Sequence, residues 1–155
     1  MSAEARQLPM FEVPQEQATS DDYYTPEWVF QAMGLHFDLD VAAPPGGVPW
    51  IPCSKFFTKA DDGLSRAWYG RVWMNPPYSQ PEPWVDRFIA HSNGVCLVPM
   101  SNGRWFHRLW LAADGLVLPA DNAFKFVGGG IPIRTVLAAF GASNVAGIES
   151  IGRCR

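Results

Sequence analysis

Residues 70–99 (GRVWMNPPYSQPEPWVDRFIAHSNGVCLVP) contain the stretch that predicts the fold class. Segment 70–74 has the pattern of a buried strand, 82–91 that of a helix with one apolar face, and 94–99 that of a central strand. A strand, a helix and a second strand in this order are typical of parallel strands joined by a helical crossover. The stretch therefore predicts an α/β fold.

Segments on both sides extend this pattern. Thr25 is expected as the N-cap and Pro26 as the first residue of a helix that ends at Gly34. The further elements expected are a short strand at 37–41, a helix at 104–113, a strand at 115–118, and a hairpin formed by 123–127 and 135–140 around three glycines. Together they predict an α/β sandwich whose sheet is mostly parallel and ends in a C-terminal antiparallel hairpin.

The composition fits one folded domain. The chain has 155 residues, 48% of them hydrophobic, and a formal net charge of −3, which excludes the disordered class. Because no apolar run reaches the roughly 20 residues of a membrane span and no secretory leader is visible, we expect a cytoplasmic protein without a membrane partner. The three cysteines form no CxxC pair and the three histidines share no ligand spacing, so neither a disulfide framework nor a metal site is expected.

The chain also divides by periodicity and by charge. Residues 1–20 are polar and lack apolar periodicity, so we expect a flexible N-terminal arm, followed by a catalytic domain at 21–142 and a C-terminal tail at 143–155. Residues 1–40 carry a formal charge of −7, and residues 41–155 carry +4. A nucleic-acid partner is therefore compatible with the acidic total, because the local sign of the charge matters more than the sum.

The candidate catalytic motif is Asn75-Pro76-Pro77-Tyr78, which directly follows the strand expected at 70–74. Ligands of open α/β sheets gather at the carboxyl ends of strands. The Asn75 side-chain carbonyl and the Pro76 backbone carbonyl can each accept one N–H of an exocyclic amine, which localises the lone pair of the nitrogen for attack. Proline fixes the direction of the second carbonyl, and Tyr78 can stack on a base. The alternative interpretation is a proline turn without a chemical role.

Five segments of the chain, in order, resemble the phage-type DNA N6-adenine methyltransferases. They are DYYTP at 22–26, FDLDVAA at 37–43, FFTKADDGL at 56–64, WYGRVWMNPPYS at 68–79 and KFVGG at 125–129. The resemblance implies a compact class I (Rossmann-like) methyltransferase fold and S-adenosylmethionine as the cofactor. It also implies site-specific transfer of a methyl group to N6 of adenine in DNA.

The resemblance assigns residues to the site as well. Asn75, Pro76, Pro77 and Tyr78 match the catalytic motif, and cofactor-binding residues are expected at Tyr24, Thr25, Pro26, Asp40, Ala42, Asp61, Asp62 and Leu64. Thr25 and Pro26 match a segment that closes over the methionine end of the cofactor, and Asp40 matches an acid near its amino group. Asp61 or Asp62 matches an acid that faces the adenine amine, with Leu64 packing on the ring.

The expected partner is double-stranded DNA, from which the target base must be flipped because its amine lies inside the duplex. Phosphate contacts are expected at Arg104, Lys125 and Arg134, for which plain solvation is the alternative. Two other functions stay open. One is methylation of another planar amine, in RNA adenine or at cytosine N4; the other is a catalytically decayed nucleic-acid-binding relic, since residues 42–47 (AAPPGG) lack the GxGxG spacing of broader methyltransferases.

Overall fold

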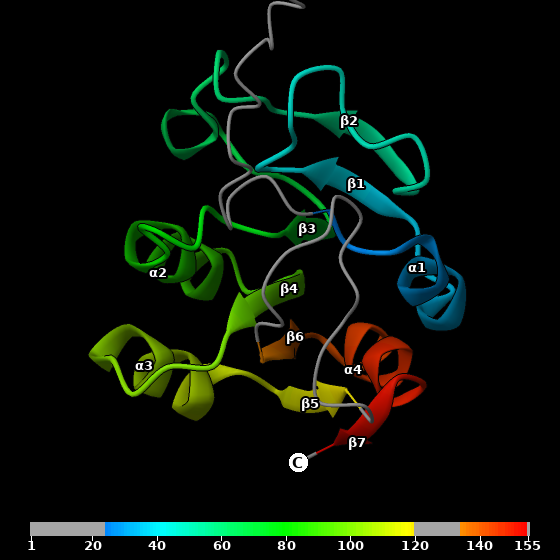
Figure 1. Cartoon of the computed structure of the whole chain (residues 1–155), viewed down its shortest axis with the longest axis vertical. Coiled ribbons are helices and arrows are strands. Elements are labelled where there is room, and N and C mark those ends of the chain that lie inside the picture. The colour runs from blue at the N-terminus through cyan, green and yellow to red at the C-terminus, as the bar shows by residue number, and fades with distance from the viewer. Residues whose placement is uncertain (1–23, 120–133, 155) are drawn as a thin grey trace, which may run out of the picture.

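The computed structural model describes residues 24–119 and 134–154, which form one sheet covered by helices (Figure 1). The strands are β1 (Phe37–Asp40), β2 (Cys53–Phe56), β3 (Val72–Met74), β4 (Gly94–Pro99), β5 (Gly115–Pro119), β6 (Thr135–Phe140) and β7 (Gly152–Cys154). The helices are α1 (Glu27–Met33), α2 (Glu82–His91), α3 (Arg104–Ala112) and α4 (Ala142–Glu149), with a 3₁₀ turn at Gly63–Ser65.

The seven strands lie in the order β2-β1-β3-β4-β6-β5-β7. The pairs β1–β2, β1–β3 and β3–β4 are parallel, whereas β4–β6, β5–β6 and β5–β7 are antiparallel. Strands β1 to β5 therefore point in one direction, and β6 and β7 run against them. This mixed sheet between two helical layers confirms the predicted α/β fold class.

The two helical layers bury opposite faces of the sheet (Figure 1). Along β3, Val72 and Met74 pack in the core beneath α2 and α3, whereas Trp73 between them packs in the core beneath α1 and α4. Phe30 of α1 meets Trp73 edge-on, with ring centroids 4.7 Å apart. Successive side chains of a strand point to opposite faces, so three buried residues in a row indicate a strand covered on both sides.

Two expectations at the ends of the domain are wrong. Segment 143–155, expected as a tail, contains most of α4 and all of β7, and β7 pairs with β5. The N-cap of α1 is Pro26 rather than Thr25, and this residue makes no side-chain hydrogen bond to the first turn of the helix. The expected C-terminal end is confirmed, since Gly34 stands there with a φ of 63°, in the left-handed region that glycine adopts without strain.

A loop rather than a helix joins the parallel strands β1 and β2. Residues 41–52 form this connection, and Gly47 within it has a φ of 73°. A Cβ on Gly47 would lie 2.9 Å from the Phe56 ring, so only glycine allows the loop to pack against β2. The loop leaves the carboxyl ends of β1, β2 and β3 open on one edge of the sheet. The expected hairpin strand at 123–127 and the expected arm at 1–20 lie outside the described residues.

Candidate active site

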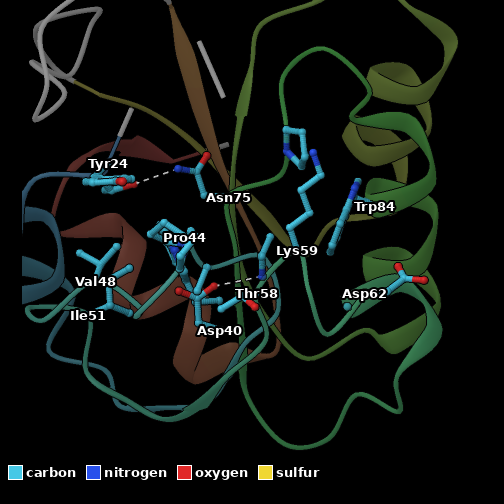
Figure 2. Close-up of a pocket in the computed structure, with 17 residues that line it drawn as sticks. Tyr24, Asp40, Pro44, Val48, Ile51, Thr58, Lys59, Asp62, Asn75 and Trp84 are labelled. Carbon is cyan, nitrogen blue, oxygen red and sulfur yellow. Dashed lines mark hydrogen bonds between the residues drawn. The ribbon is translucent and has the colours of Figure 1, made fainter. Parts of the chain in front are cut away.

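A cavity of about 480 Å³ lies at the carboxyl ends of β1, β2 and β3 (Figure 2). This is the edge at which ligands of open α/β sheets bind, and the volume lies within the range of small-molecule sites. Its lining residues are Tyr24, Thr25, Asp40, Ala42, Ala43, Pro44, Pro45, Val48, Ile51, Thr58, Lys59, Asp62, Gly63, Trp73, Asn75, Pro77 and Trp84. Figure 2 shows Tyr24, Val48 and Ile51 on one side and Lys59 and Trp84 on the other.

Asn75 presents an unused hydrogen-bond acceptor at this cavity. Its Oδ1 atom is buried and has no hydrogen-bond partner among the residues that the structure describes. Its Nδ2 atom lies 3.5 Å from Oγ1 of Thr25, which orients the amide. A buried acceptor without a partner costs about 1–3 kcal/mol, so its presence at a cavity indicates that a ligand supplies the donor.

Thr25 is itself held by the loop between β1 and β2. Its side chain is 1% exposed, and its backbone carbonyl accepts a 2.8 Å hydrogen bond from Nε1 of Trp50. Because the Thr25 hydroxyl does not cap α1, it is free to meet Asn75. The Thr25 hydroxyl therefore belongs to the candidate site rather than to the N-terminus of α1.

Asp40 is a buried carboxyl group at the end of β1. It is 2% exposed, and its Oδ1 accepts a hydrogen bond of 3.2 Å from the backbone N–H of Ala42. Burial raises the pKa of Asp40 from 3.8 to about 7, against the smaller lowering effect of that hydrogen bond. A carboxyl group with this pKa favours a cationic ligand, because a nearby positive charge stabilises the ionised form.

The acids at 61 and 62 occupy different environments. The Asp61 carboxylate accepts hydrogen bonds from the Thr58 backbone N–H at 2.9 Å and from its hydroxyl at 3.1 Å, and these bonds lower the pKa of Asp61. Asp62 lines the cavity and has a φ of 55°. Leu64 is half-buried and lies outside the cavity lining, where its carbonyl accepts a hydrogen bond from Arg87. Of these three predicted contacts, the structure brings Asp62 alone to the cavity.

Of the remaining residues of the candidate catalytic motif, Pro77 alone lines the cavity. Pro76 is buried next to it. Tyr78 lies outside the cavity lining; its hydroxyl is buried and unpaired within the described part of the chain. Burial raises the pKa of Tyr78 above its usual range, and the neighbouring Cys96 adds to this effect.

Comparison with known proteins identifies the group to which this arrangement belongs. A family model described as DNA N-6-adenine-methyltransferase (Dam) matches residues 13–134. The chain is a member of this Dam family. It is 31% identical over 123 residues to a DNA N-6-adenine-methyltransferase of Haemophilus phage HP1 (strain HP1c1), across 72% of this chain and 69% of that protein. It is 34% identical over 94 residues to a protein of the same description from Escherichia phage T1, across 50% of this chain and 38% of that protein.

Membership of the Dam family confirms the resemblance inferred from the five sequence segments. The structure places Tyr24, Thr25, Asp40, Ala42 and Asp62 of the expected cofactor residues at the cavity. Pro26 is buried at the start of α1, directly after Thr25. Segments far apart in sequence thus meet at one edge of the sheet.

Sequence reasoning missed two side chains on the wall opposite Tyr24. Lys59 and Trp84 line the cavity, and Figure 2 shows them side by side in its view, with the Lys59 chain extended. The sequence pattern at 82–91 predicts a helix with one apolar face, and it gives Trp84 no role in the site. The signal that could have found it is its place in the first turn of the helix that follows the candidate motif, six residues after Tyr78.

Two of the three expected phosphate contacts, Arg104 and Arg134, lie at the neighbouring part of the same edge. Arg104 is exposed at the start of α3, and Arg134 is exposed directly before β6. The Arg134 carbonyl accepts a 2.9 Å hydrogen bond from the Met100 N–H, which places it beside the carboxyl end of β4. Lys125 lies outside the described residues.

The described residues contain neither a candidate metal site nor a candidate membrane-spanning helix. No group of three or more His, Cys, Asp or Glu side chains in residues 24–119 and 134–154 is arranged to hold a metal ion. No helix in these two ranges is both long enough and apolar enough to span a membrane.

Proposed function

We propose that this chain transfers a methyl group from S-adenosylmethionine to N6 of adenine at specific sites in double-stranded DNA. The observation that carries the proposal is the buried Oδ1 of Asn75, which has no hydrogen-bond partner within the described ranges and lies in a cavity at the carboxyl edge of the sheet. Membership of the Dam family and the descriptions of two phage relatives support the same reaction.

Asn75 and Pro76 act on the target amine. The amine of adenine is a weak nucleophile because its lone pair is delocalised into the ring. The Asn75 side-chain oxygen and the Pro76 backbone carbonyl each accept one N–H, and this pair of acceptors favours the geometry in which the lone pair points outward. Thr25 accepts from Nδ2 of Asn75, which leaves Oδ1 of the same amide as the atom that accepts from the target amine. The site thus activates the amine by fixed hydrogen bonds.

The cavity fits the methyl donor by chemistry and by size. Asp40 supplies a buried acid for the amino group of the donor, and Trp84 and Asp62 supply an aromatic surface and an acceptor for its purine. When bound, S-adenosylmethionine supplies an electrophilic methyl group on a sulfonium. The apolar residues Val48 and Ile51 line the side near Tyr24, where they limit the access of water to the reacting atoms.

DNA approaches from the edge that carries Asn75. Arg104 and Arg134 are exposed beside the carboxyl end of β4. In the sheet, β4 lies between β3 and β6 and is separated from β1 by β3 alone. Cations at this position attract the phosphates that flank a flipped adenine. Because both relatives are phage proteins, we place the reaction in the cytoplasm of a phage host.

The test is methyl transfer from labelled S-adenosylmethionine to unmethylated duplex DNA, with RNA as a second substrate. The products are digested to nucleosides and separated by mass spectrometry. The proposal predicts N6-methyldeoxyadenosine from DNA. Exclusive formation of N4-methyldeoxycytidine or of methylated RNA would assign the second function, and binding of DNA without any transfer would assign the decayed relic.

A further inference from the structure

Trp84, which lines one wall of the cavity, belongs to a group of α2 side chains that contact Trp68. Trp84, Arg87 and His91 are spaced three and four residues apart, so they share one face of the helix. The Trp84 ring stacks on Trp68 with centroids 6.4 Å apart and planes inclined by 28°. The Arg87 guanidinium lies 5.1 Å from the centroid of Trp68, and the His91 ring meets Trp68 edge-on at 6.0 Å. Trp68 therefore packs against three consecutive positions of this helix face.

Arg87 also fixes the backbone of the segment that follows Asp62. Its two terminal nitrogens donate hydrogen bonds to the carbonyls of Leu64 and Arg66. Trp68 adds a 2.8 Å hydrogen bond from Nε1 to the carbonyl of Gly63. These three hydrogen bonds thus attach residues 63–66 to α2 and to the Trp68 ring that packs on it.

Gly63 connects this attached segment to the cavity, because it belongs to the segment and also lines the cavity. A Cβ on Gly63 would lie 2.2 Å from the carbonyl oxygen of Val41 and 3.2 Å from the Trp84 ring, so the backbone there is enclosed between the end of β1 and α2. Gly63 and Trp84 both line the cavity. Displacement of the 63–66 segment would therefore move the cavity wall.

We propose that Arg87 is a positioning residue for the cofactor: it holds Trp84 and Gly63 where the purine of the methyl donor packs. This inference rests on the proposed function. Arginine suits the role because its planar fork can donate to two carbonyls while its face lies over an aromatic ring. Lysine retains the charge, but its compact ammonium does not reproduce that planar geometry.

The test compares Arg87→Met with Arg108→Met as a matched control. Arg108 is the arginine of α3 that pairs with Glu82 and Asp86 of α2, so its replacement also removes a guanidinium contact to α2. The readouts are the Kd for S-adenosylhomocysteine by calorimetry, kcat at saturating donor, and the near-ultraviolet circular dichroism of the stacked Trp68 and Trp84.

For Arg87→Met we expect a rise in Kd of about tenfold, because ligand binding must then also order the 63–66 segment and the Trp84 ring that Arg87 positions in the wild type. We also expect an altered tryptophan signal and a kcat close to that of the wild type. The inhibition constant of adenosine, measured by its competition with S-adenosylhomocysteine, should rise by the same factor. Arg108→Met should change none of these quantities.

Arg87→Lys keeps the test decisive if the methionine variant does not fold. A Kd above that of the wild type in the lysine variant supports the proposal, and wild-type affinity in that variant overturns it. Equal loss in the Arg87 and Arg108 variants also overturns it, because the effect is then general stability. Failure of the wild type itself to bind S-adenosylhomocysteine would contradict the proposed function instead.

Discussion

Replacing Asp40 with asparagine should remove a pH-dependent penalty from the ligand-free protein. Burial raises the pKa of Asp40 to about 7 in the folded chain, from 3.8 as its ordinary value. Between these two values the folded state holds a proton that the unfolded state has released. The free energy of unfolding therefore falls as pH rises through this window, by at most about 4 kcal/mol when the window is complete. The asparagine variant has no proton to release at this position and avoids this loss.

The raised pKa of Asp40 sets the expected difference in the free energy of unfolding between the two proteins. From pH 5 to pH 8, the advantage of Asp40→Asn over the wild type should increase by about 2.5 kcal/mol. Below about pH 3 the Asp40 carboxyl is protonated in both the folded and the unfolded state, and this contribution to the difference should disappear. Asparagine keeps the oxygen that accepts the Ala42 N–H, so the local backbone hydrogen bond is preserved.

Urea denaturation of both proteins at pH 5, 6, 7 and 8 measures this difference, because all other titrating groups cancel in the comparison. S-adenosylhomocysteine binding supplies a second readout. Wild-type affinity should increase as pH rises through 7, since an ionised Asp40 attracts the amino group of the ligand, whereas the variant should bind weakly at every pH. A stability difference that stays constant from pH 5 to pH 8 would refute the reasoning.

Three further variants test other contacts of the site. Tyr78→Phe removes a buried hydroxyl that has no hydrogen-bond partner among the described residues, so it should stabilise the protein by about 1 kcal/mol in urea denaturation. A loss of stability would show that the hydroxyl has a partner. Thr25→Val should lower the rate of methyl transfer roughly three- to tenfold, because the Asn75 amide loses the contact that orients it. An unchanged rate would contradict this proposed role of Thr25. Replacing Arg104 and Arg134 with alanine should reduce the slope of log K for DNA binding against log salt concentration by about 2. Arg108→Ala should leave this slope unchanged. Equal slopes in all proteins would place the DNA on another face.

Elements with strong periodicity were predictable from the sequence. The bounds expected for α2, β4 and β6 match the structure, because each segment has a clear apolar pattern between turn residues. Helix α4 was missed because its sequence, ASNVAGIE, contains asparagine and glycine and has no extended apolar stripe. Its Gly147 instead allows close packing, since a Cβ there would lie 2.6 Å from Leu35. Such a helix depends on tertiary contacts that local propensity does not contain.

Site residues that belong to sequence motifs were predictable, whereas residues that reach the site through tertiary packing were less so. Asn75, Thr25 and Asp40 were expected, and all three line the cavity. The choice between Asp61 and Asp62 required coordinates, because a turn decides which carboxylate bonds to Thr58. The support of Trp84 by Arg87 has no motif, since it joins side chains through contacts that no local sequence pattern records.

The most direct test of the central claim compares Asn75→Ala and Asn75→Asp with the wild type. The claim is that Oδ1 of Asn75, which has no hydrogen-bond partner in the described ranges, accepts a hydrogen bond from the target amine. Transfer of labelled methyl groups to duplex DNA is measured at saturating donor, together with the Kd for S-adenosylhomocysteine. We expect alanine to lower transfer by about 100-fold or more while Kd changes little. Aspartate keeps the oxygen and should retain part of the activity. Transfer by Asn75→Ala within a few-fold of the wild type would show that Asn75 does not activate the target amine.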